Sequence, residues 1–400
     1  MGPVQTMGAI LLPPLLSDCP TASAMDIAIA PPIDALQAVT HADPAPYYAQ
    51  LAATRAFFFD AGQGWWVAAS AKAVDTVLGS DACRVRPADE PVPNAVAASP
   101  TGAFFGRLVR QIDGPEHGMR KATVMGALGQ LDPSALAARA HRQAYAALPD
   151  TAQLDAALAG DAHFRVPLAT MAQTLLGDAA DAPACHADIA AYLAALGPAA
   201  DATSVAQADA AVRRLHGRFE GSPLVAGNDD AEVDNLAALL AQTYDACAGL
   251  LGNCIVALSR HAALRTRLRA QPDAVEPFVR EVLRHDAPVQ NTRRFVQRDV
   301  QLLGQHVQAG QRILVLLAAA NVDADANPAP LRFDIDRPAP RLWTFGAGVH
   351  RCPAETLATI IARETVRHLL SLPGIDRWLG NLGEVTYRAS PNARIPVFAA

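Results

Sequence analysis

The chain has 400 residues, of which 51% are hydrophobic and 18% charged, a composition that supports a large buried core and excludes a disordered chain. Its 33 basic and 39 acidic residues give a net charge of −6, which argues against a general nucleic-acid-binding protein. Its six cysteines are scattered without a Cys-x-x-Cys pair, which excludes a disulfide scaffold and a paired-cysteine zinc site and predicts reduced thiols in a cytoplasmic protein.

The N-terminal segment, residues 1–30, is predicted to be a disordered extension. Residues 8–16 form a short apolar run, but no lysine or arginine precedes it and two prolines interrupt it. This run therefore fits neither a signal peptide nor a membrane-spanning helix, and no membrane association is expected. Met25 is an alternative start of the chain.

Helical periodicity dominates the rest of the chain. Apolar spacing predicts helices over residues 35–55, 114–148, 152–177, 183–197, 203–219, 231–269, 272–286 and 353–371. Turn signals predict a hairpin at 56–69, a long loop at 84–104, short strands within 289–317 and an irregular, functional segment at 321–344. Because strands and helices do not alternate regularly, we expect a mainly α (α+β) fold rather than a doubly wound sheet or a parallel barrel.

Residues 345–354, FGAGVHRCPA, form the most specific motif of the chain. Two glycines let the backbone turn tightly and approach a flat ligand closely. Cys352 precedes a predicted helix whose dipole and free N–H groups favour a thiolate, and Pro353 suits the first helical position. A thiolate in apolar surroundings is a good axial ligand for haem iron, so the motif favours a haem site over an inert buried cysteine.

This motif resembles the cysteine loop of the cytochrome P-450 family, the haem-thiolate monooxygenases, and the resemblance runs from about Trp65 to the C-terminus. It implies the helix-rich P-450 fold, with haem b (iron protoporphyrin IX) between a long central helix and the helix that follows the loop. Cys352 is then the axial iron ligand. Ala354 departs from the glycine that is usual in the family. Because the motifs must converge on one haem, we predict a single domain over residues 31–400.

Two further motifs follow the family's order. Glu281-x-x-Arg284 places both side chains on one face of a helix, and the resemblance joins them to Arg332 in a structural triad that holds the haem-binding core. A second Glu-x-x-Arg, Glu364 and Arg367, is interpreted as a solvated pair. Haem propionates are carboxylates that suit Arg and His donors. The resemblance assigns cofactor binding to His117, Arg120, Arg294, Phe345, His350 and Cys352.

The long central helix departs from the family at the position of its catalytic threonine. Aligning the helix acid with Asp245 places Ala246 35 residues before the first Glu of Glu-x-x-Arg, where the family has a threonine that helps to deliver protons. A rival alignment through Ala248-Gly249 puts Leu251 at the acid position and ranks second. Three explanations stay open: the substrate supplies the hydroxyl; Asp245, Thr243 or ordered water replaces it; or the enzyme uses peroxide or catalyses coupling or desaturation.

The resemblance implies a monooxygenase of specialised metabolism that inserts one oxygen atom from O2 into a small or medium organic substrate. Electrons would come from a separate ferredoxin or flavodoxin with its reductase. A second alternative is a non-catalytic haem-binding sensor or scaffold. A basic patch on the thiolate side would suit an acidic redox partner, formed by Arg107, Arg110, Lys121, Arg351 and Arg363. The predicted substrate pocket comprises Phe104, Phe105, Leu240, Gln242, Tyr244, Val289 and Asn291.

Overall fold

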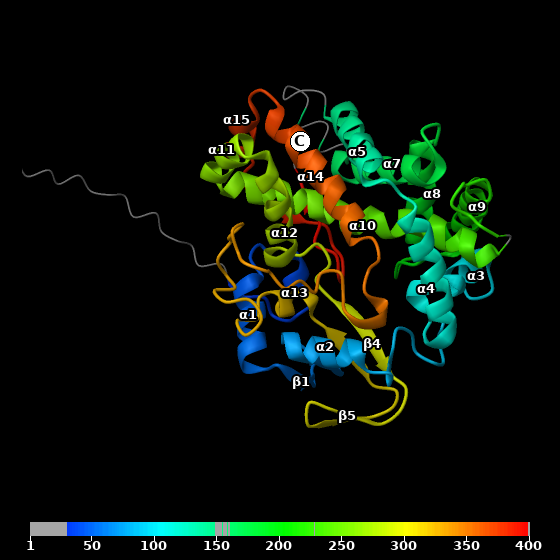
Figure 1. The fold of residues 1–400 in the computed structure, drawn as a ribbon. Helices are drawn as coiled ribbons and strands as arrows, with labels where there is room; N and C mark the ends of the chain where they lie inside the picture. Colours follow the sequence, from blue (N-terminus) through cyan, green and yellow to red (C-terminus); the bar gives the residue numbers. More distant parts are fainter. Residues whose placement is uncertain (1–29, 149–153, 155–157, 159–160, 228, 399–400) are drawn as a thin grey trace, which may run out of the picture. The chain divides into compact units, whose positions relative to one another are not determined.

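A computed structural model describes residues 30–148, 154, 158, 161–227 and 229–398 (Figure 1). Residues Pro31–Ala400 form one compact unit. The predicted extension over residues 1–30 lies outside the described residues, apart from Ala30. The mainly helical class with a small sheet contribution is confirmed.

Helices form most of this unit (Figure 1). The α-helices are α1 (Ala45–Thr54), α2 (Ala71–Gly79), α3 (Pro100–Arg107), α4 (Gly114–Gly129), α5 (Pro133–Ala147), α7 (Ala162–Leu176), α8 (Ala182–Ala195), α9 (Ala202–Phe219), α10 (Asp230–Arg260), α11 (Ala262–Ala270), α12 (Val275–His285), α13 (Leu317–Asn321), α14 (Glu355–Ser371) and α15 (Ile375–Gly380). Short 3-10 turns are η1 (Gln37–Thr40), η2 (Val109–Gln111), η4 (Pro272–Ala274) and η5 (Gly348–His350).

Three predicted helices are each divided into two elements in the structure. The helix predicted over 114–148 is divided into α4 and α5, because Asp132 caps a new helix that has Pro133 in its first turn. The helix predicted over 231–269 ends at Arg260, and α11 continues at an angle of 108°. The helix predicted over 35–55 likewise divides into η1 and α1.

Two other predicted segments need correction at their ends. The predicted loop 84–104 already contains most of α3, which begins where the Ser99 side chain accepts a hydrogen bond from the N–H of Gly102. The first part of the helix predicted over 152–177 falls largely outside the described residues, and α7 begins at Ala162.

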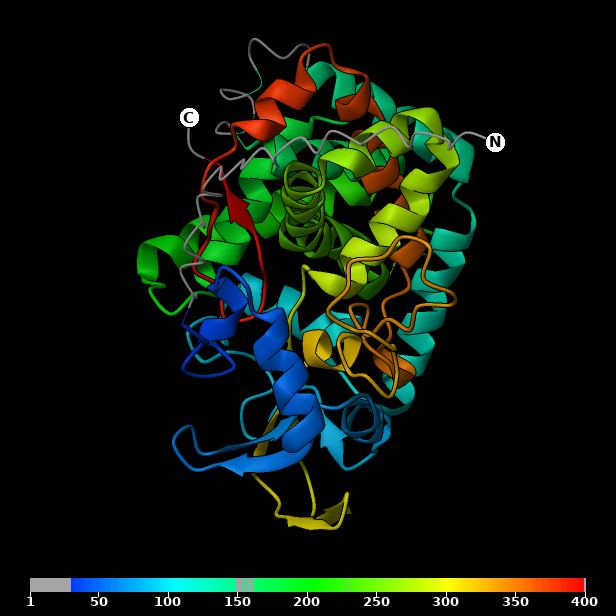
Figure 2. The same cartoon turned by 90° about the vertical axis from the view of Figure 1, so that its left-hand side faces the viewer.

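The predicted hairpin at 56–69 is confirmed as β1 (Phe57–Asp60) and β2 (Trp65–Ala68), which pair antiparallel with Phe57 opposite Ala68. This hairpin joins a five-stranded sheet in the order β1-β2-β7-β4-β3, in which β2 and β7 run parallel. Figure 2 shows the blue hairpin and the yellow strands together on one side of the helices. The remaining strands are β3 (Cys83–Arg84), β4 (Thr292–Val296), β5 (Val300–Leu302), β6 (Gln305–Val307), β7 (Arg312–Val315), β8 (Thr386–Tyr387) and β9 (Pro396–Val397).

Helix α10 is the centre of the helical part. It is seen nearly end-on in Figure 2, and its side chains contribute to both of the largest hydrophobic clusters. One cluster joins α10 to α7, α8 and α9, and the other joins it to α12, α14 and α15. In the described part of the chain, no single helix is long and apolar enough to cross a membrane. Helices α10 and α11, which are bent by 108° relative to each other, reach the required length and apolar composition only when they are taken together.

Candidate cofactor-binding site

Cys352 lies in the tight turn that the glycine pattern predicts. Gly346 and Gly348 have φ angles of 71° and 66°, in the left-handed region that favours glycine. A Cβ atom on Gly348 would lie 2.8 Å from the carbonyl oxygen of Leu78, so there is no room for a side chain at this position. The turn closes where the N–H of Cys352 donates to the carbonyl oxygen of Phe345 at 2.8 Å.

The thiol of Cys352 faces the start of α14. Its Sγ accepts a hydrogen bond from the N–H of Ala354 at 3.4 Å. The helix begins at Glu355, so the prediction of Pro353 as the first helical residue is wrong. Burial raises the pKa of the Cys352 thiol, although the Ala354 N–H and the charge of Lys121 act in the opposite direction. Desolvation therefore outweighs the helix terminus, and a bound cation is what would convert this thiol to a thiolate.

Four basic side chains gather around one carboxylate beside this turn. His350 Nε2 lies 2.9 Å from Asp113 Oδ1, and the rings of His117 and His350 are 4.1 Å apart. The charges of Arg84 and Arg294 both act on Asp113. Burial, reinforced by the charge of His350, lowers the pKa of His117 to about 4, so its ring is neutral at pH 7.

These groups have hydrogen-bonding capacity left for an anionic ligand. Arg84 Nε is buried without a hydrogen-bond partner among the described residues. Arg294 is only 5% exposed, and its side chain donates to the carbonyl oxygen of Arg293 at 2.9 Å. A buried guanidinium is costly unless an anion pairs with it. The cluster therefore fits a ligand with carboxylate groups, and the two propionates of haem b beside a thiol ligand meet that requirement.

Arg120, which the sequence assigns to this group, is directed elsewhere. Its guanidinium pairs with Glu116 and donates to the carbonyl oxygen of Arg107. Lys121 instead donates from Nζ to the carbonyl oxygen of Arg351 on the cysteine turn. Lys121 follows His117 by four residues, and side chains four apart share one helix face. That spacing was the signal that could have identified Lys121, whereas nothing in the sequence singles out Arg84.

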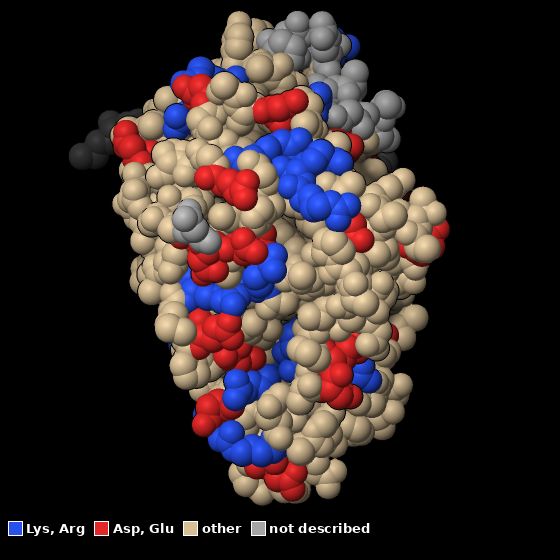
Figure 3. Space-filling model, turned by 90° about the vertical axis from the view of Figure 1, so that its right-hand side faces the viewer, with Lys and Arg blue, Asp and Glu red and all other residues tan. Residues whose placement is uncertain are grey.

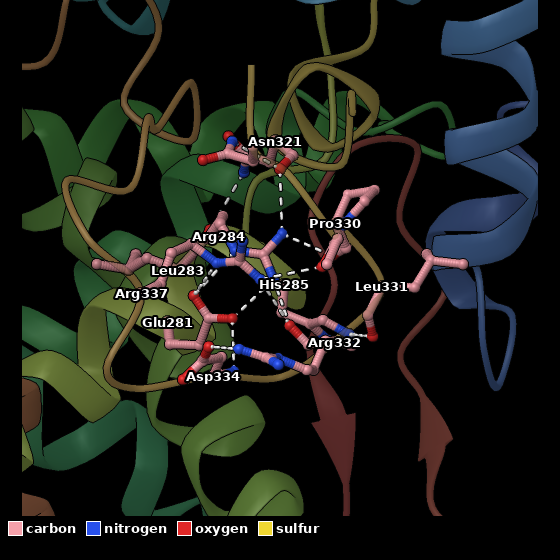
Figure 4. A network of polar contacts seen from close by, with 12 residues as sticks. Glu281, Leu283, Arg284, His285, Asn321, Pro330, Leu331, Arg332, Asp334 and Arg337 are labelled. Carbon is pink, nitrogen blue, oxygen red and sulfur yellow. Dashed lines mark hydrogen bonds and ion pairs between the residues drawn. The ribbon is translucent and has the colours of Figure 1, made fainter. Parts of the chain in front are cut away.

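Glu281 and Arg284 of α12 form a buried ion pair (Figure 4). Arg284 Nη2 lies 2.7 Å from Glu281 Oε1, and Arg284 Nε lies 2.9 Å from Oε2. The third arginine is Arg337, whose Nε lies 3.5 Å from Glu281 Oε2. The assignment of Arg332 is wrong, because its side chain is 71% exposed and pairs with Asp334. Arg332 contributes only its carbonyl oxygen, which accepts from Arg284 at 3.1 Å.

Next to Ala246, two polar side chains of the central helix have partners on other elements. Asp245 pairs with Arg388, with side-chain exposures of 36% and 39%, and Tyr244 Oη lies 3.1 Å from a histidine nitrogen of α8. Thr243 donates its hydroxyl to the carbonyl oxygen of Leu239 on the same helix at 2.8 Å. Neighbouring Ala246 carries no hydroxyl. Asp245 is therefore a partly exposed acid in the middle of this helix, and Arg388 is a partner that the sequence did not indicate.

The predicted pocket residues lie in packed surroundings. Phe104 and Leu240 belong to one hydrophobic cluster with exposures of 1% and 0%, and Phe104 meets Tyr192 edge-on at 5.2 Å. Asn291 donates to the carbonyl oxygen of Pro391 at 2.9 Å, and its Oδ1 is buried without a partner within the described ranges. Their role as pocket lining stays a prediction, as it does for Phe105, Gln242, Tyr244 and Val289.

The predicted basic patch is largely neutralised. Arg363 pairs with two glutamates at 2.8 Å each, Arg351 pairs with Glu355 at 2.6 Å, and Arg107 pairs with Asp234 at 2.5 Å. On the side of the molecule that carries α4 and α5, basic and acidic groups alternate (Figure 3). This face therefore presents paired charges rather than one positive field.

The Cytochrome P-450 family model matches residues 257–371 of the chain. Among curated relatives, the vitamin D(3) 25-hydroxylase of Pseudonocardia autotrophica is 37% identical over 158 residues, 39% of each chain. The biotin biosynthesis cytochrome P-450 of Bacillus subtilis is 32% identical over 150 residues, 37% of this chain and 36% of that one. The matched region thus spans less than half the length of these relatives.

Solved structures extend the similarity to the fold. CalO2 superposes with a TM-score of 0.75 at 24% identity, covering 89% of this chain and 94% of that one. CYP109Q5 from Chondromyces apiculatus superposes with a TM-score of 0.70 at 22% identity, covering 91% and 96%. At these identities the likeness establishes the fold.

Proposed function

Because the chain belongs to the cytochrome P-450 family, we propose that it is a haem-thiolate monooxygenase that inserts one oxygen atom from O2 into a small or medium organic substrate. The observation that carries the proposal is the Cys352 turn beside four buried or half-buried basic side chains that share the single carboxylate of Asp113. Together they provide one soft metal ligand and several donors for carboxylates, which is the donor set that haem b needs.

The residues would have three tasks around the cofactor, which are to bind the iron, to support the cysteine turn and to hold the propionates. Haem b, when bound, supplies the iron at which dioxygen is activated, and a thiolate ligand favours O–O cleavage. Cys352 Sγ would be that ligand, and Lys121 braces its turn through a carbonyl oxygen. The guanidinium groups of Arg84 and Arg294, with the two histidines, would hold the propionates.

Proton supply is assigned to Asp245. Its side chain is 36% exposed, so solvent reaches it, and it is adjacent in sequence to Ala246. Thr243 is a poor donor for this task because its hydroxyl already serves the carbonyl oxygen of Leu239. The missing hydroxyl at Ala246 is the observation that favours a second candidate function, in which the enzyme uses peroxide or catalyses coupling or desaturation.

The electron source is proposed to be a separate ferredoxin or flavodoxin with its reductase, in the cytoplasm and in specialised metabolism. Because the arginines beside the thiolate are paired with acids, association with that partner should depend less on ionic strength than a free basic patch would. The measurement is the rate at which the partner reduces the enzyme, at several salt concentrations. A rate that falls with salt as steeply as in a strongly charged complex would contradict the inference that these arginines are paired with acids.

The test is turnover of the holoenzyme with NADH, ferredoxin reductase and ferredoxin under isotopically labelled dioxygen, after a screen for compounds that shift the haem spectrum. One labelled oxygen atom per product molecule supports the monooxygenase. Product that forms only with added hydrogen peroxide, or that has lost hydrogen without gaining oxygen, supports the second candidate. Ligands that shift the spectrum without any turnover would instead indicate a sensor or scaffold.

A further inference from the structure

Strand β4 alternates between the two faces of the five-stranded sheet. Arg294 is buried on one face, where the charge of Asp113 acts on it. Arg293 and Phe295 point to the opposite face and are more exposed, because side chains alternate along a strand. Arg312 of the neighbouring strand β7 is paired with Phe295 and therefore also lies on this opposite face, which we call the outer face of the sheet.

Helix α1 covers only part of the outer face. Val67 of β2 and Leu314 of β7 are each 1% exposed and belong to the same hydrophobic cluster as Tyr48 of α1. Two residues earlier on the same strands, Trp65 is partly exposed and Arg312 is exposed. Strands β7 and β4 are inner strands in the order β1-β2-β7-β4-β3. The outer face therefore has an uncovered part away from the sheet edges, which is formed by Trp65, Arg293, Phe295 and Arg312.

The two arginines of this uncovered part have no acidic partner among the described residues, which give neither Arg293 nor Arg312 an ion pair or a side-chain hydrogen bond. Burial lowers the pKa of Arg293 and the charge of Arg312 lowers it further, so the two guanidinium groups repel each other. The guanidinium carbon of Arg312 lies 5.9 Å from the centroid of the Trp65 ring, which suits a cation–π contact. Arg84 of the neighbouring strand β3 differs, because its charge acts on the carboxylate of Asp113.

Asp60 of β1 is an acid that the strand register places on the outer face, opposite Trp65. Its Oδ1 accepts hydrogen bonds from the N–H groups of Gly62 and Gln63 in the hairpin turn, at 3.0 and 3.2 Å. Strand β2 separates β1 from β7, so Asp60 lies two strands away from Arg312. The positive charge of the uncovered part is therefore left for carboxylates of another molecule to compensate.

The spacing of the two arginines matches that of side chains in an extended segment. Because Arg312 is opposite Phe295, Arg293 and Arg312 are diagonal neighbours on adjacent antiparallel strands, roughly 7 Å apart. Side chains two residues apart on one face of an extended chain are also roughly 7 Å apart. An acidic residue at every second position therefore brings one carboxylate to each guanidinium, in the bidentate geometry that arginine favours.

We propose that the uncovered part of the outer face is a docking surface for an extended, acidic segment of a protein partner. Arg293 and Arg312 pair with its carboxylates, and the partly exposed rings of Trp65 and Phe295 supply apolar contact beside them. A nucleic acid fits less well, because the chain carries a net charge of −6 and two arginines are few for a phosphate backbone. This surface lies on the sheet face opposite Arg294, and the inference does not depend on the proposed reaction.

The test is isothermal titration calorimetry of the holoenzyme with a synthetic peptide of four Glu-Ser repeats, at low and at high salt. A peptide of four Gln-Ser repeats is the neutral control. The variants are Arg293→Gln, Arg312→Gln and the double variant. The matched control is Arg377→Gln, which removes an exposed arginine of α15 that likewise has no ion pair within the described ranges.

The Glu-Ser peptide should bind the parent chain at low salt and more weakly at high salt, because salt screens exposed charges. Each single substitution should weaken binding about threefold and the double substitution about 10-fold, as expected for exposed ion pairs. Arg377→Gln should stay within about twofold of the parent chain, and the Gln-Ser peptide should not bind. If circular dichroism shows that Arg312→Gln does not fold, Arg312→Lys replaces it and should still lose affinity, because an ammonium group lacks the fork.

No binding of the Glu-Ser peptide, or binding that the double variant keeps, would refute the docking surface. Inorganic phosphate that binds as tightly as the peptide would indicate a small-anion site instead, and binding to phosphatidylserine vesicles but not to the peptide would indicate a membrane surface. Both results would overturn the proposal. Because the readout is binding, its failure leaves the proposed monooxygenase intact, and a chain without turnover can still bind the peptide.

Discussion

The two Glu-x-x-Arg pairs of this chain allow a comparison of how burial changes the contribution of an ion pair to stability. Glu281 and Arg284 have side-chain exposures of 2% and 0%, and Arg284 donates five hydrogen bonds, two to the glutamate and three to main-chain carbonyl oxygens. Glu364 and Arg367 have the same spacing and a contact of 3.0 Å, but exposures of 11% and 32%. The two pairs differ mainly in the exposure of the arginine side chain, which is 0% for Arg284 and 32% for Arg367.

Arg284→Ala should destabilise the fold by about 3–5 kcal/mol, because the buried Glu281 carboxylate loses two charge-assisted hydrogen bonds and the carbonyl oxygen of Pro330 loses its donor. The carbonyl oxygens of Asn321 and Arg332 keep hydrogen bonds from Asn327 and Arg337.

The interpretation of Glu364 and Arg367 as a solvated pair is wrong for the glutamate, which is 11% exposed and also pairs with Arg363 at 2.8 Å. Arg367→Ala should cost about 1 kcal/mol, because Arg363 stays as a partner of Glu364 and Arg367 itself is 32% exposed. The larger loss is a substantial part of the about 5–15 kcal/mol that stabilises a typical domain. Arg284→Lys should recover little, since an ammonium group cannot replace a fork of five donors.

The assay is urea unfolding of each variant, followed by far-ultraviolet circular dichroism and tryptophan fluorescence, whose transitions must coincide for a two-state reading. If Arg284→Ala does not accumulate as folded protein, Glu281→Gln removes the charge while keeping the shape. Equal losses for the two arginines, or a loss below about 1 kcal/mol for Arg284→Ala, would refute the reasoning that burial sets the value of this pair.

Three further predictions concern the site and the pH dependence of stability. Gly348→Ala should cost about 2 kcal/mol and reduce haem retention, because the new Cβ meets the carbonyl oxygen of Leu78 and the φ angle is 66°; haem content after gel filtration is the readout, and unchanged loading would contradict it. Burial lowers the pKa of His163 to about 4, below the unfolded value of 6.5, so the native state binds fewer protons and its stability is present above pH 6.5 and is lost as the pH falls towards 4. His163→Leu should flatten that decline by on the order of 2 kcal/mol in unfolding curves between pH 7 and pH 4, whereas an unchanged slope would exclude His163 as the titrating group. Asp245→Asn should lower coupled turnover roughly 10²-fold and release peroxide, with a smaller effect for Arg388→Ala, and product that still matches NADH consumed would place proton delivery elsewhere.

Local patterns predicted the elements whose structure depends on near neighbours. The paired glycines before Cys352 indicated a tight turn, and the structure has positive φ angles at both. The Glu281-x-x-Arg284 spacing indicated one helix face, and the two side chains meet there. In each case the relevant contacts lie within one turn of the chain, where sequence spacing determines geometry.

Contacts between residues that lie far apart in the sequence could not be predicted from it. Arg337 reaches Glu281 across an irregular segment that has no period to count, so the earlier Arg332 was assigned in its place. Arg84 lies in a two-residue strand, and the N–H of the next residue, Val85, donates to Asp113 Oδ2 at 3.0 Å and so places Arg84 near this carboxylate. Helix α10 was predicted too long because alanine-rich periodicity continues through His261, where the backbone bends.

The thiolate of Cys352 is the claim on which the account depends. Its most direct test is the spectrum of the reduced, carbon-monoxide-bound holoenzyme, measured for the parent chain and for Cys352→Ser. We predict the red-shifted Soret band of thiolate ligation in the parent chain and its loss in the variant, with overall folding preserved. A haem-loaded, folded parent chain without that band, or a variant that keeps it, would contradict the assignment of Cys352 as the axial ligand.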